Sequence, residues 1–275
     1  MRADLSQKYE QLKDCLREAG GLVVGFSGGV DSTLVLRAAT EALGERALAV
    51  TVASPIHPRF EVEEARCLAR AIGAAHRVVE VDPLADETIK HNPPDRCYHC
   101  KRSVFGVLQK IAREEGLPIV VDGSNVDDEG DYRPGMKALA ELNVRSPLRE
   151  VGLGKDEIRE LSRELGLPTW DKPALACLAT RVPYGEELTP ERLRRIEAAE
   201  DFLRAMGLRQ VRVRDHRDIA RIETPADEFA VLMAEEKRTR VVAELQRLGY
   251  AYVTLDIGGY RTGSMNVGVK EGGGD

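Results

Sequence analysis

The chain has 275 residues, a length typical of one large domain or two smaller ones. Its residues are 43% hydrophobic and 31% charged, which supplies a sizeable core and excludes wholesale disorder. The net charge of −6 and the aromatic content of 5% argue against a large nucleic-acid footprint. We therefore expect a globular protein for which nucleic acid is not the main partner.

Nothing in the sequence predicts attachment to a membrane. No stretch approaches the roughly 20 apolar residues that a spanning helix needs. Residues 1–20 read as a charged amphipathic helix without the apolar region of a signal peptide. The five cysteines, an odd number, do not suggest a disulfide framework. We therefore expect a cytoplasmic protein with no membrane partner.

Strands and helices are predicted to alternate over the first two-thirds of the chain. Apolar runs predict strands at 22–26, 47–53, 76–81 and 118–122. Apolar periodicity predicts helices from about residue 32 and at 59–72, 98–115, 136–142 and 155–165. Pro93 and Pro94 stop any earlier helix, and Asp95 is placed to cap the one at 98–115. This alternation is typical of a parallel α/β sheet flanked by helices.

The pattern changes in the last third of the chain. Residues 168–187 contain three prolines and little periodicity, which predicts a long functional loop or hinge. From residue 189 the order is helix, strand (210–213), strand (220–223), two helices and strand (252–256), as in a smaller α+β domain. We expect domains at 1–168 and 169–267 and a flexible tail at 268–275.

A glycine-rich turn, Ser27-Gly28-Gly29-Val30-Asp31-Ser32-Thr33, lies between the first predicted strand and its helix. Its glycines permit a tight turn, and its hydroxyls and the helix N-terminus favour phosphate oxygens. The string lacks the Gly-Lys-Ser/Thr of a Walker loop, and a plain strand–helix turn is the alternative. We call residues 27–33 the phosphate loop.

The phosphate loop resembles the PP-loop of adenine nucleotide alpha hydrolase-like enzymes, which adenylate a substrate and release pyrophosphate. The resemblance implies that Asp31 binds Mg²⁺ and acts in catalysis. It further implies that ATP is bound by Ser27, Gly28, Gly29, Asp31, Ser32 and Thr33.

Polar residues also follow two other predicted strands. Ser54 ends the second strand, and Gly123, Ser124 and Asn125 follow the fourth. The carboxyl ends of parallel strands meet at one edge of a sheet, where ligands bind. We expect these residues to cradle the adenosine, with ordinary structural turns as the alternative.

Three cysteines form a candidate metal site. Cys97 and Cys100 are spaced to project from one face of a helix start, and Cys177 lies in the long loop. Three thiolates suit a zinc ion with an open position or three corners of a [4Fe–4S] cluster. A helix start without metal is the alternative, and His99 is expected to face away. Cys15 and Cys67 read as ordinary buried or half-buried residues.

Cys177 has a second possible role, as a nucleophile. A thiolate beside a basic residue such as Arg181 would have a lowered pKa. Its attack on an acyl-adenylate would give a thioester. Elimination at the Cβ–S bond would then transfer the sulfur and leave dehydroalanine.

The chain from about Glu10 to Asn266 resembles the LarE family of PP-loop sulfur transferases. The resemblance rests on FSGGVDST, NPPDRCYHCK, DGSNVDDEGDYRPG, the Cys177 loop with RVPYG, the RVRDH and ARIE pair, and LDIGGYRTGSMN. It implies a substrate, pyridinium-3,5-biscarboxylic acid mononucleotide, whose carboxylates ATP adenylates and sulfur converts to thiocarboxylates. It also implies nickel-pincer nucleotide cofactor biosynthesis, service to lactate racemase or another nickel enzyme, and a homo-oligomer.

The family resemblance implies two possible sulfur sources. In simpler members a single cysteine, matching Cys177, gives up its own sulfur. Other members hold a [4Fe–4S] cluster on three cysteines and use sulfide or another sulfur donor repeatedly. Cys97 and Cys100 favour the cluster type here, which leaves open whether Cys177 is a sacrificial donor or a cluster ligand.

The second domain offers a candidate site for the anionic groups of the substrate. The period of a strand puts Arg212 and Arg214 on one face, where guanidinium groups suit phosphate or carboxylate. A solvated basic strand face is the alternative. Glu223 is placed to orient the arginines. The full expected set is Thr180, Arg181, Glu200, Arg212, Arg214, Glu223 and Arg261, with Thr180 and Glu200 implied by the resemblance.

Three other functions fit parts of the sequence. A tRNA-thiolating PP-loop enzyme fits the cysteines, but the acidic composition counts against it. An amide-forming ligase of the NAD- or GMP-synthetase kind has no evident use for Cys177. A module that binds ATP without turnover would not exchange ATP with pyrophosphate.

Overall fold

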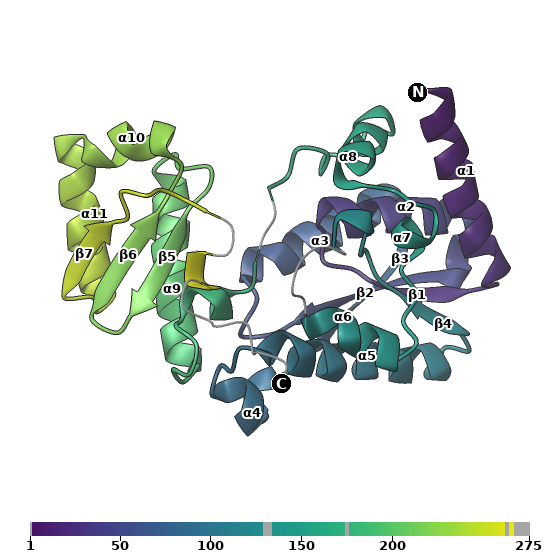
Figure 1. Ribbon diagram of the computed structural model, residues 1–275, viewed down its shortest axis with the longest axis horizontal. Helices are drawn as coiled ribbons and strands as arrows, with labels where there is room; N and C mark the ends of the chain where they lie inside the picture. Colours follow the sequence, from purple (N-terminus) through teal and green to yellow (C-terminus); the bar gives the residue numbers. More distant parts are fainter. Residues whose placement is uncertain (1, 129–133, 174–175, 262–263, 267–275) are drawn as a thin grey trace, which may run out of the picture. The chain divides into compact units, whose positions relative to one another are not determined.

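The computed structural model describes residues 2–128, 134–173, 176–261 and 264–266 (Figure 1). The chain divides into two compact units, one of residues 1–83 with 95–175 and the other of 84–94 with 176–275. Each unit has a β-sheet of its own. The expected boundary after residue 168 stays a prediction, and the expected tail at 268–275 lies outside the described residues.

The first unit is built on four parallel strands in the order β3-β2-β1-β4. The strands are β1 (Leu22–Gly25), β2 (Ala47–Ala53), β3 (Ala75–Glu80) and β4 (Ile119–Val121), which confirms the four predicted strands to within two residues at each end. The chain runs outward from β1 to β3 and then places β4 on the other side of β1. The order therefore reverses between β1 and β4, the position at which such sheets bind ligands.

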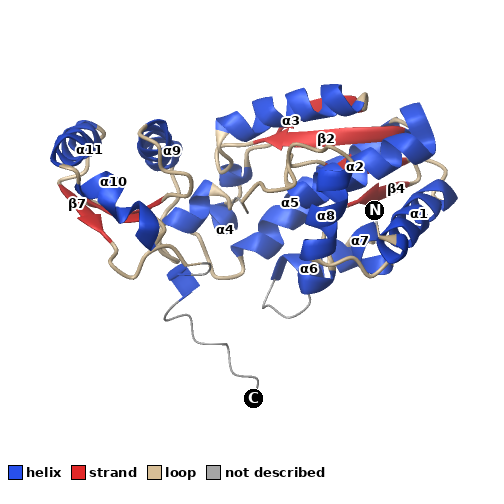
Figure 2. Ribbon diagram, turned by 90° about the horizontal axis from the view of Figure 1, so that it is seen from above, coloured by secondary structure: helices blue, strands red, loops and turns tan. Residues whose placement is uncertain are grey.

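Helices cover both faces of this sheet (Figure 2). They are α1 (Ala3–Glu18), α2 (Val30–Leu43), α3 (Arg59–Ile72), α5 (Arg96–Glu114), α6 (Pro134–Glu141) and α8 (Lys155–Glu164). All six match predicted helices. The four-residue helix α7 (Pro147–Glu150) was not predicted, because it is too short to show a helical period.

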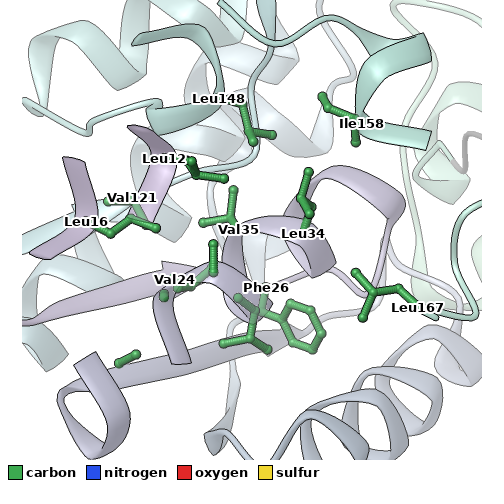
Figure 3. Packing of buried hydrophobic residues seen from close by; sticks show 14 of the residues in the cluster. Leu12, Leu16, Val24, Phe26, Leu34, Val35, Val121, Leu148, Ile158 and Leu167 are labelled. Carbon is green, nitrogen blue, oxygen red and sulfur yellow. The ribbon is translucent and has the colours of Figure 1, made fainter. Parts of the chain in front are cut away.

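The residues of β1 alternate between two hydrophobic cores. Leu22 and Val24 pack with α1, α2 and α8 in a core that includes Leu12, Leu34 and Ile158 (Figure 3). Val23 points to the opposite core, with residues of α5 and α6. Burial on both faces explains why this strand reads as a continuous apolar run.

The second unit is a three-stranded sheet with helices, as predicted for the smaller α+β domain. Its strands are β5 (Arg212–His216), β6 (Ile219–Glu223) and β7 (Tyr252–Leu255), and the order is β5-β6-β7. β5 pairs antiparallel and β7 pairs parallel with β6. The helices are α4 (Glu87–Lys90), which was not predicted, α9 (Pro190–Ala205), α10 (Phe229–Met233) and α11 (Glu235–Arg247).

The core of the second unit fixes which residues of β5 can face a ligand. Val213 packs with Leu203 of α9, Ile222 of β6 and Leu245 of α11. The side chains of Arg212 and Arg214, one position to either side, therefore leave the opposite face of the strand. In the described parts of both units, no helix is long and apolar enough to cross a membrane.

Candidate active site

The phosphate loop joins β1 to α2 by a turn that depends on glycine. Gly28 has φ +68°, a left-handed conformation that glycine adopts without strain. Gly29 is the N-cap of α2 and accepts a hydrogen bond from the Thr33 N–H at 3.0 Å. The helix therefore begins at Val30, two residues earlier than predicted. Asp31 lies in its first turn, at the positive end of the helix dipole.

The serine hydroxyls of the phosphate loop brace the loop itself. The Oγ atoms of Ser27 and Ser32 lie 3.1 Å apart, and Ser27 Oγ accepts the Gly29 N–H at 3.3 Å. Ser32 Oγ also donates to the Gly29 carbonyl at 3.3 Å. Thr33 is fully buried, and its hydroxyl has no hydrogen-bond partner among the described residues. These internal hydrogen bonds hold the loop in shape.

A cavity of about 490 Å³ lies beside the phosphate loop, entirely within the first unit. This volume suits a small-molecule ligand. Its apolar wall includes Phe26, Val52, Val104, Phe105 and Leu108. Of the expected nucleotide-binding residues, its lining contains Ser27, Asp31, Ser32, Gly123 and Ser124.

Ser54 follows β2, as expected, and its role in binding stays a prediction. It is not among the described residues that line the cavity. Its hydroxyl accepts the Ile56 N–H at 3.3 Å, and its carbonyl accepts the His57 N–H at 3.0 Å. Ser54 therefore builds the turn that brings His57 to the cavity wall. Burial lowers the pKa of His57, and among the described residues its Nδ1 has no hydrogen-bond partner.

The segment after β4 packs directly against the phosphate loop. A Cβ atom at Gly123 would lie 2.9 Å from the backbone nitrogen of Ser32, so only glycine allows this approach. The Asn125 side chain donates to Asp31 Oδ1 at 3.2 Å. Ser124 donates to the buried carboxylate of Asp122. These contacts bring two predicted segments, 91 residues or more apart in sequence, to one edge of the sheet.

The carboxylate of Asp31 is paired with a cation that sequence reasoning missed. Lys155 Nζ lies 2.6 Å from each Asp31 oxygen. Lys155 is the first residue of α8, and its backbone N–H donates to Asp127 Oδ2 at 2.6 Å, which fixes where the helix begins. The ammonium shows that this carboxylate accepts a cation. A carboxylate is a hard oxygen ligand, so the site fits the Mg²⁺ that accompanies ATP.

Cys97 and Cys100 both lie in the first turns of α5. Cys100 lines the cavity beside the phosphate loop, and Cys97 is exposed. Asp95 takes the N-cap position of α5, as predicted, but its side chain makes no capping hydrogen bond, and its Oδ2 lies 3.2 Å from His99 Nε2. The helix places Cys100 in the wall of the cavity beside the phosphate loop.

The remaining cysteines of the first unit differ in exposure. Cys67 is exposed, contrary to expectation, because it lies on the outer side of α3. Cys15 is half-buried, and burial together with a hydrogen bond to Glu150 raises its pKa to about 11. Neither lines the cavity among the described residues.

The described residues contain no group of three or more His, Cys, Asp or Glu side chains that could hold a metal ion. Cys97 and Cys100 belong to the first unit, and Cys177 belongs to the second. As a donor set, three cysteine thiols fit an iron–sulfur cluster, whose iron prefers thiolate ligands.

In the second unit, Arg181 connects Cys177 to the buried core. The Arg181 guanidinium is buried and pairs with Glu200 at 2.8 Å. It also donates to the carbonyl oxygens of Ala176 and Cys177. Thr180 Oγ1 donates to the same Cys177 carbonyl at 2.8 Å. Arg181 and Thr180 therefore hold the backbone that carries the Cys177 thiol.

The pKa of Glu200 reports the balance of charge in this core. Full burial would raise the pKa of Glu200, but the charge and hydrogen bond of Arg181 hold it below its usual value. Glu200 also accepts the backbone N–H of Val213 at 3.0 Å, which ties α9 to β5. The carboxylate is therefore ionised and serves both elements.

The expected arginine pair lies on one face of β5, and both guanidinium groups are buried. Arg214 donates to Glu223 Oε2 at 2.7 Å and to the Thr180 carbonyl at 3.1 Å. Burial and the nearby charge of Arg181 lower the pKa of Arg212, whose guanidinium lies over the ring of Tyr260. Positive charge is thus concentrated where it is poorly solvated, an arrangement that a bound anion would stabilise.

Arg261 lies farther along this charged network. It is exposed and lies against the turn at Gly258. That turn is held by Asp256, which pairs with Arg221, and Arg221 lies 3.0 Å from Glu223 Oε1. Arg221 was not predicted, although the period of β6 places it on the same side as Glu223.

Comparison with known proteins identifies relatives along almost the whole chain. A family model described as NAD synthase matches residues 5–101. An uncharacterized protein of Synechocystis sp. is 43% identical over 95% of this chain and 98% of its own length. An uncharacterized protein of Methanocaldococcus jannaschii is 29% identical over 95% of this chain and 96% of its own length.

A third relative has a named activity. The pyridinium-3,5-bisthiocarboxylic acid mononucleotide synthase of Lactiplantibacillus plantarum is 42% identical over 96% of this chain and 95% of its own length. Identity at this level across both full lengths confirms the resemblance drawn from the motifs. The chain belongs to the LarE family of ATP-dependent sulfur transferases, enzymes that use ATP with Mg²⁺ on a PP-loop fold.

Proposed function

We propose that this chain converts the carboxylates of pyridinium-3,5-biscarboxylic acid mononucleotide to thiocarboxylates, at the expense of ATP, in nickel-pincer nucleotide cofactor biosynthesis. The product would be the compound for which the Lactiplantibacillus plantarum relative is named. The observation that carries the proposal is the cavity whose wall contains both Asp31 of the phosphate loop and the Cys100 thiol. An amide-forming ligase has no use for a thiol beside its nucleotide.

The first step is adenylation. A carboxylate oxygen of the substrate attacks the α-phosphorus of ATP, and the bond to the β-phosphate oxygen breaks. Pyrophosphate leaves with the electron pair of the broken bond. The phosphate loop would donate N–H groups to the departing phosphates, and Asp31 would hold the Mg²⁺ that neutralises their charge. Gly123 packs against the backbone of the loop, and Asn125 donates a hydrogen bond to Asp31, so both fix the position of the carboxylate.

The second step brings sulfur to the activated carboxyl carbon. In the single-cysteine route, the Cys177 thiolate attacks this carbon, and AMP leaves with the electron pair of the broken bond. Removal of the Cys177 Cα proton then expels the thiocarboxylate from Cβ and leaves dehydroalanine. Atoms and electrons balance without an oxidant. Arg181 and Thr180 hold the Cys177 backbone for this reaction.

We propose that the sulfur source is a [4Fe–4S] cluster bound by Cys97, Cys100 and Cys177. A cluster held by three cysteines leaves one iron able to bind sulfide from an external donor, which would spare the protein its own sulfur. Iron and acid-labile sulfide would be measured after anaerobic purification. We expect near-stoichiometric cluster that is lost in Cys97→Ala and kept in Cys67→Ala. Absence of iron would leave Cys177 as a single-use donor, with the protein lighter by one H₂S after turnover.

The second unit would bind the anionic groups of the substrate. Arg212 and Arg214 present buried guanidinium groups that suit phosphate or carboxylate, and Glu223 orients Arg214. The whole expected set comprises Thr180, Arg181, Glu200, Arg212, Arg214, Glu223 and Arg261. Arg181 and Glu200 would act by holding this site together, since the two buried side chains form an ion pair with each other.

The test of the proposed function is the acceptor that drives AMP release. We expect ATP and the pyridinium mononucleotide together to produce AMP, whereas bulk tRNA in its place does not. AMP formation only with tRNA would overturn the assignment in favour of tRNA thiolation. Because the reaction needs reduced thiols, we place the enzyme in the cytoplasm. We further propose a homo-oligomer that serves lactate racemase or another nickel enzyme.

A further inference from the structure

A second lysine contacts the phosphate loop from the segment that leads to Cys177. Lys172 Nζ donates to the carbonyl oxygen of Gly28 at 3.0 Å and to Glu64 Oε2 of α3 at 2.7 Å. The Lys172 side chain is only 17% exposed, whereas that of Glu64 is 49% exposed. The Lys172 ammonium thus lies at the backbone of the phosphate loop. Because Glu64 is half-exposed, water weakens its attraction for this ammonium.

The phosphate loop lies directly against α3 at this point. A Cβ atom at Gly28 would lie 3.4 Å from Ala65 Cα, so the loop and the helix are in backbone contact. Ala65 follows Glu64 in α3. Lys172 therefore lies where the phosphate loop, α3 and the segment after α8 meet.

The position of Lys172 is set by its backbone as well as by its side chain. Arg159 of α8 donates to the carbonyl oxygens of Trp170 and Lys172, at 2.7 Å and 3.0 Å. The Lys172 N–H donates to the Thr169 carbonyl at 3.1 Å. The same helix begins with Lys155, which pairs with Asp31. Helix α8 thus contacts both the Asp31 carboxylate of the phosphate loop and the segment that precedes Cys177 in the sequence.

We propose that Lys172 is a positioning residue of the phosphate loop that pairs either with Glu64 or with a phosphate of the bound nucleotide. In this structure its ammonium pairs with Glu64. When the triphosphate enters the loop, a phosphate oxygen replaces Glu64, since a polyphosphate carries more negative charge than one carboxylate. This inference rests on the proposed function, because it takes the loop to bind ATP.

The experiment measures ATP affinity by calorimetry in the absence of any sulfur acceptor. Lys172→Met should weaken ATP binding about tenfold, about 1.4 kcal/mol. Glu64→Gln should strengthen it about threefold, because the competing partner of the ammonium is gone. Lys172→Arg should restore most of the affinity, and Lys110→Met, a change at an exposed lysine of α5, should leave it unchanged. Opposite effects at Lys172 and Glu64 are not expected of a merely structural ion pair.

The outcomes separate this inference from the proposed function. Equal ATP affinities in Lys172→Met, Glu64→Gln and the unaltered protein would overturn the role of Lys172 alone. Failure of the unaltered protein to bind ATP would overturn the proposed function, and this inference with it.

Discussion

The carboxylate of Asp31, the proposed Mg²⁺ ligand, is paired with Lys155. Both Asp31 oxygens lie 2.6 Å from the ammonium. On the proposal that Asp31 binds Mg²⁺, the metal and Lys155 would compete for the same carboxylate. The displaced ammonium would be available to neutralise the charge of the phosphates.

Asp31→Asn should reduce adenylation by at least about 100-fold, because an amide cannot replace the charge that holds Mg²⁺. ATP–pyrophosphate exchange in the presence of the substrate measures this step. The control is Asp156→Asn, which removes an exposed carboxylate from the first turn of α8. Exchange that survives unchanged in Asp31→Asn would remove Asp31 from catalysis.

Lys155→Met should allow Mn²⁺ to bind at Asp31 without nucleotide, because the competing cation is gone. We expect the Mn²⁺ affinity of the nucleotide-free protein, measured by electron paramagnetic resonance, to rise about tenfold. Lys110→Met should leave it unchanged. Equal Mn²⁺ affinity in Lys155→Met and the unaltered protein would show that Lys155 does not compete with the metal.

The contrast between Asp31 and Lys155 shows what the sequence can predict at this scale. Asp31 lies inside a short string whose glycines and hydroxyls already indicate phosphate binding. Lys155 lies 124 residues away, at the start of a helix that looks like any other charged helix. Only the packing of α8 against α2 makes the two residues neighbours, so no local pattern predicts the pair.

At the scale of elements, one buried ion pair joins three parts of the second unit. Glu200 of α9 pairs with Arg181, which lies in the short 3₁₀ turn Leu178–Arg181, and accepts the Val213 N–H of β5. Removing one partner of such a pair leaves the other charged and buried. This pair is therefore expected to control both the stability of the unit and the position of Cys177.

Glu200→Gln should lower the free energy of unfolding of the protein by about 3 kcal/mol, as measured by urea denaturation. Asp201→Asn, at the exposed neighbour, should change it by less than about 0.5 kcal/mol. The folded pKa of Glu200 is lowered, so its stabilising contribution is present above the unfolded pKa of about 4.3 and is lost as the pH falls below it. The stability of Glu200→Gln should therefore depend less on pH than that of the unaltered protein between about pH 5 and about pH 3, the range in which Glu200 of the unfolded chain gains its proton. An unchanged pH dependence would contradict an ionised Glu200.

Arg214→Ala should raise the KM for the pyridinium mononucleotide about tenfold and leave ATP binding unchanged, because Arg214 belongs to the second unit. Steady-state AMP release measures the first quantity and calorimetry the second. Arg194→Ala, at an exposed arginine of α9, serves as the control. An unaltered KM would place the anion site elsewhere.

Length explains which elements were predictable. Strands β1, β2 and β4 are largely buried, and the longer helices of the first unit carry a clear apolar period, so both were predicted from sequence. The four-residue helices α4 and α7 are shorter than two helical turns and show no period. The return of residues 84–94 to the second unit depends on long-range packing, such as the Asn92 side chain that donates to the Val182 carbonyl, and has no sequence signal.

At the scale of the whole molecule, two kinds of chemistry meet in one chain. The first unit combines a phosphate loop and a cysteine pair, and the second combines Cys177 with buried arginines. An ATP-dependent amide ligase needs the phosphate loop but none of the cysteines. The central claim is therefore that activation of a carboxylate ends in transfer of sulfur.

The most direct test is the mass of the product after a single turnover with ATP, Mg²⁺ and pyridinium-3,5-biscarboxylic acid mononucleotide, with ammonia and sulfide both present. We predict that sulfur replaces an oxygen of a carboxylate, in step with the AMP released. A product that contains nitrogen in that position, or an unchanged substrate despite AMP release, would contradict the account.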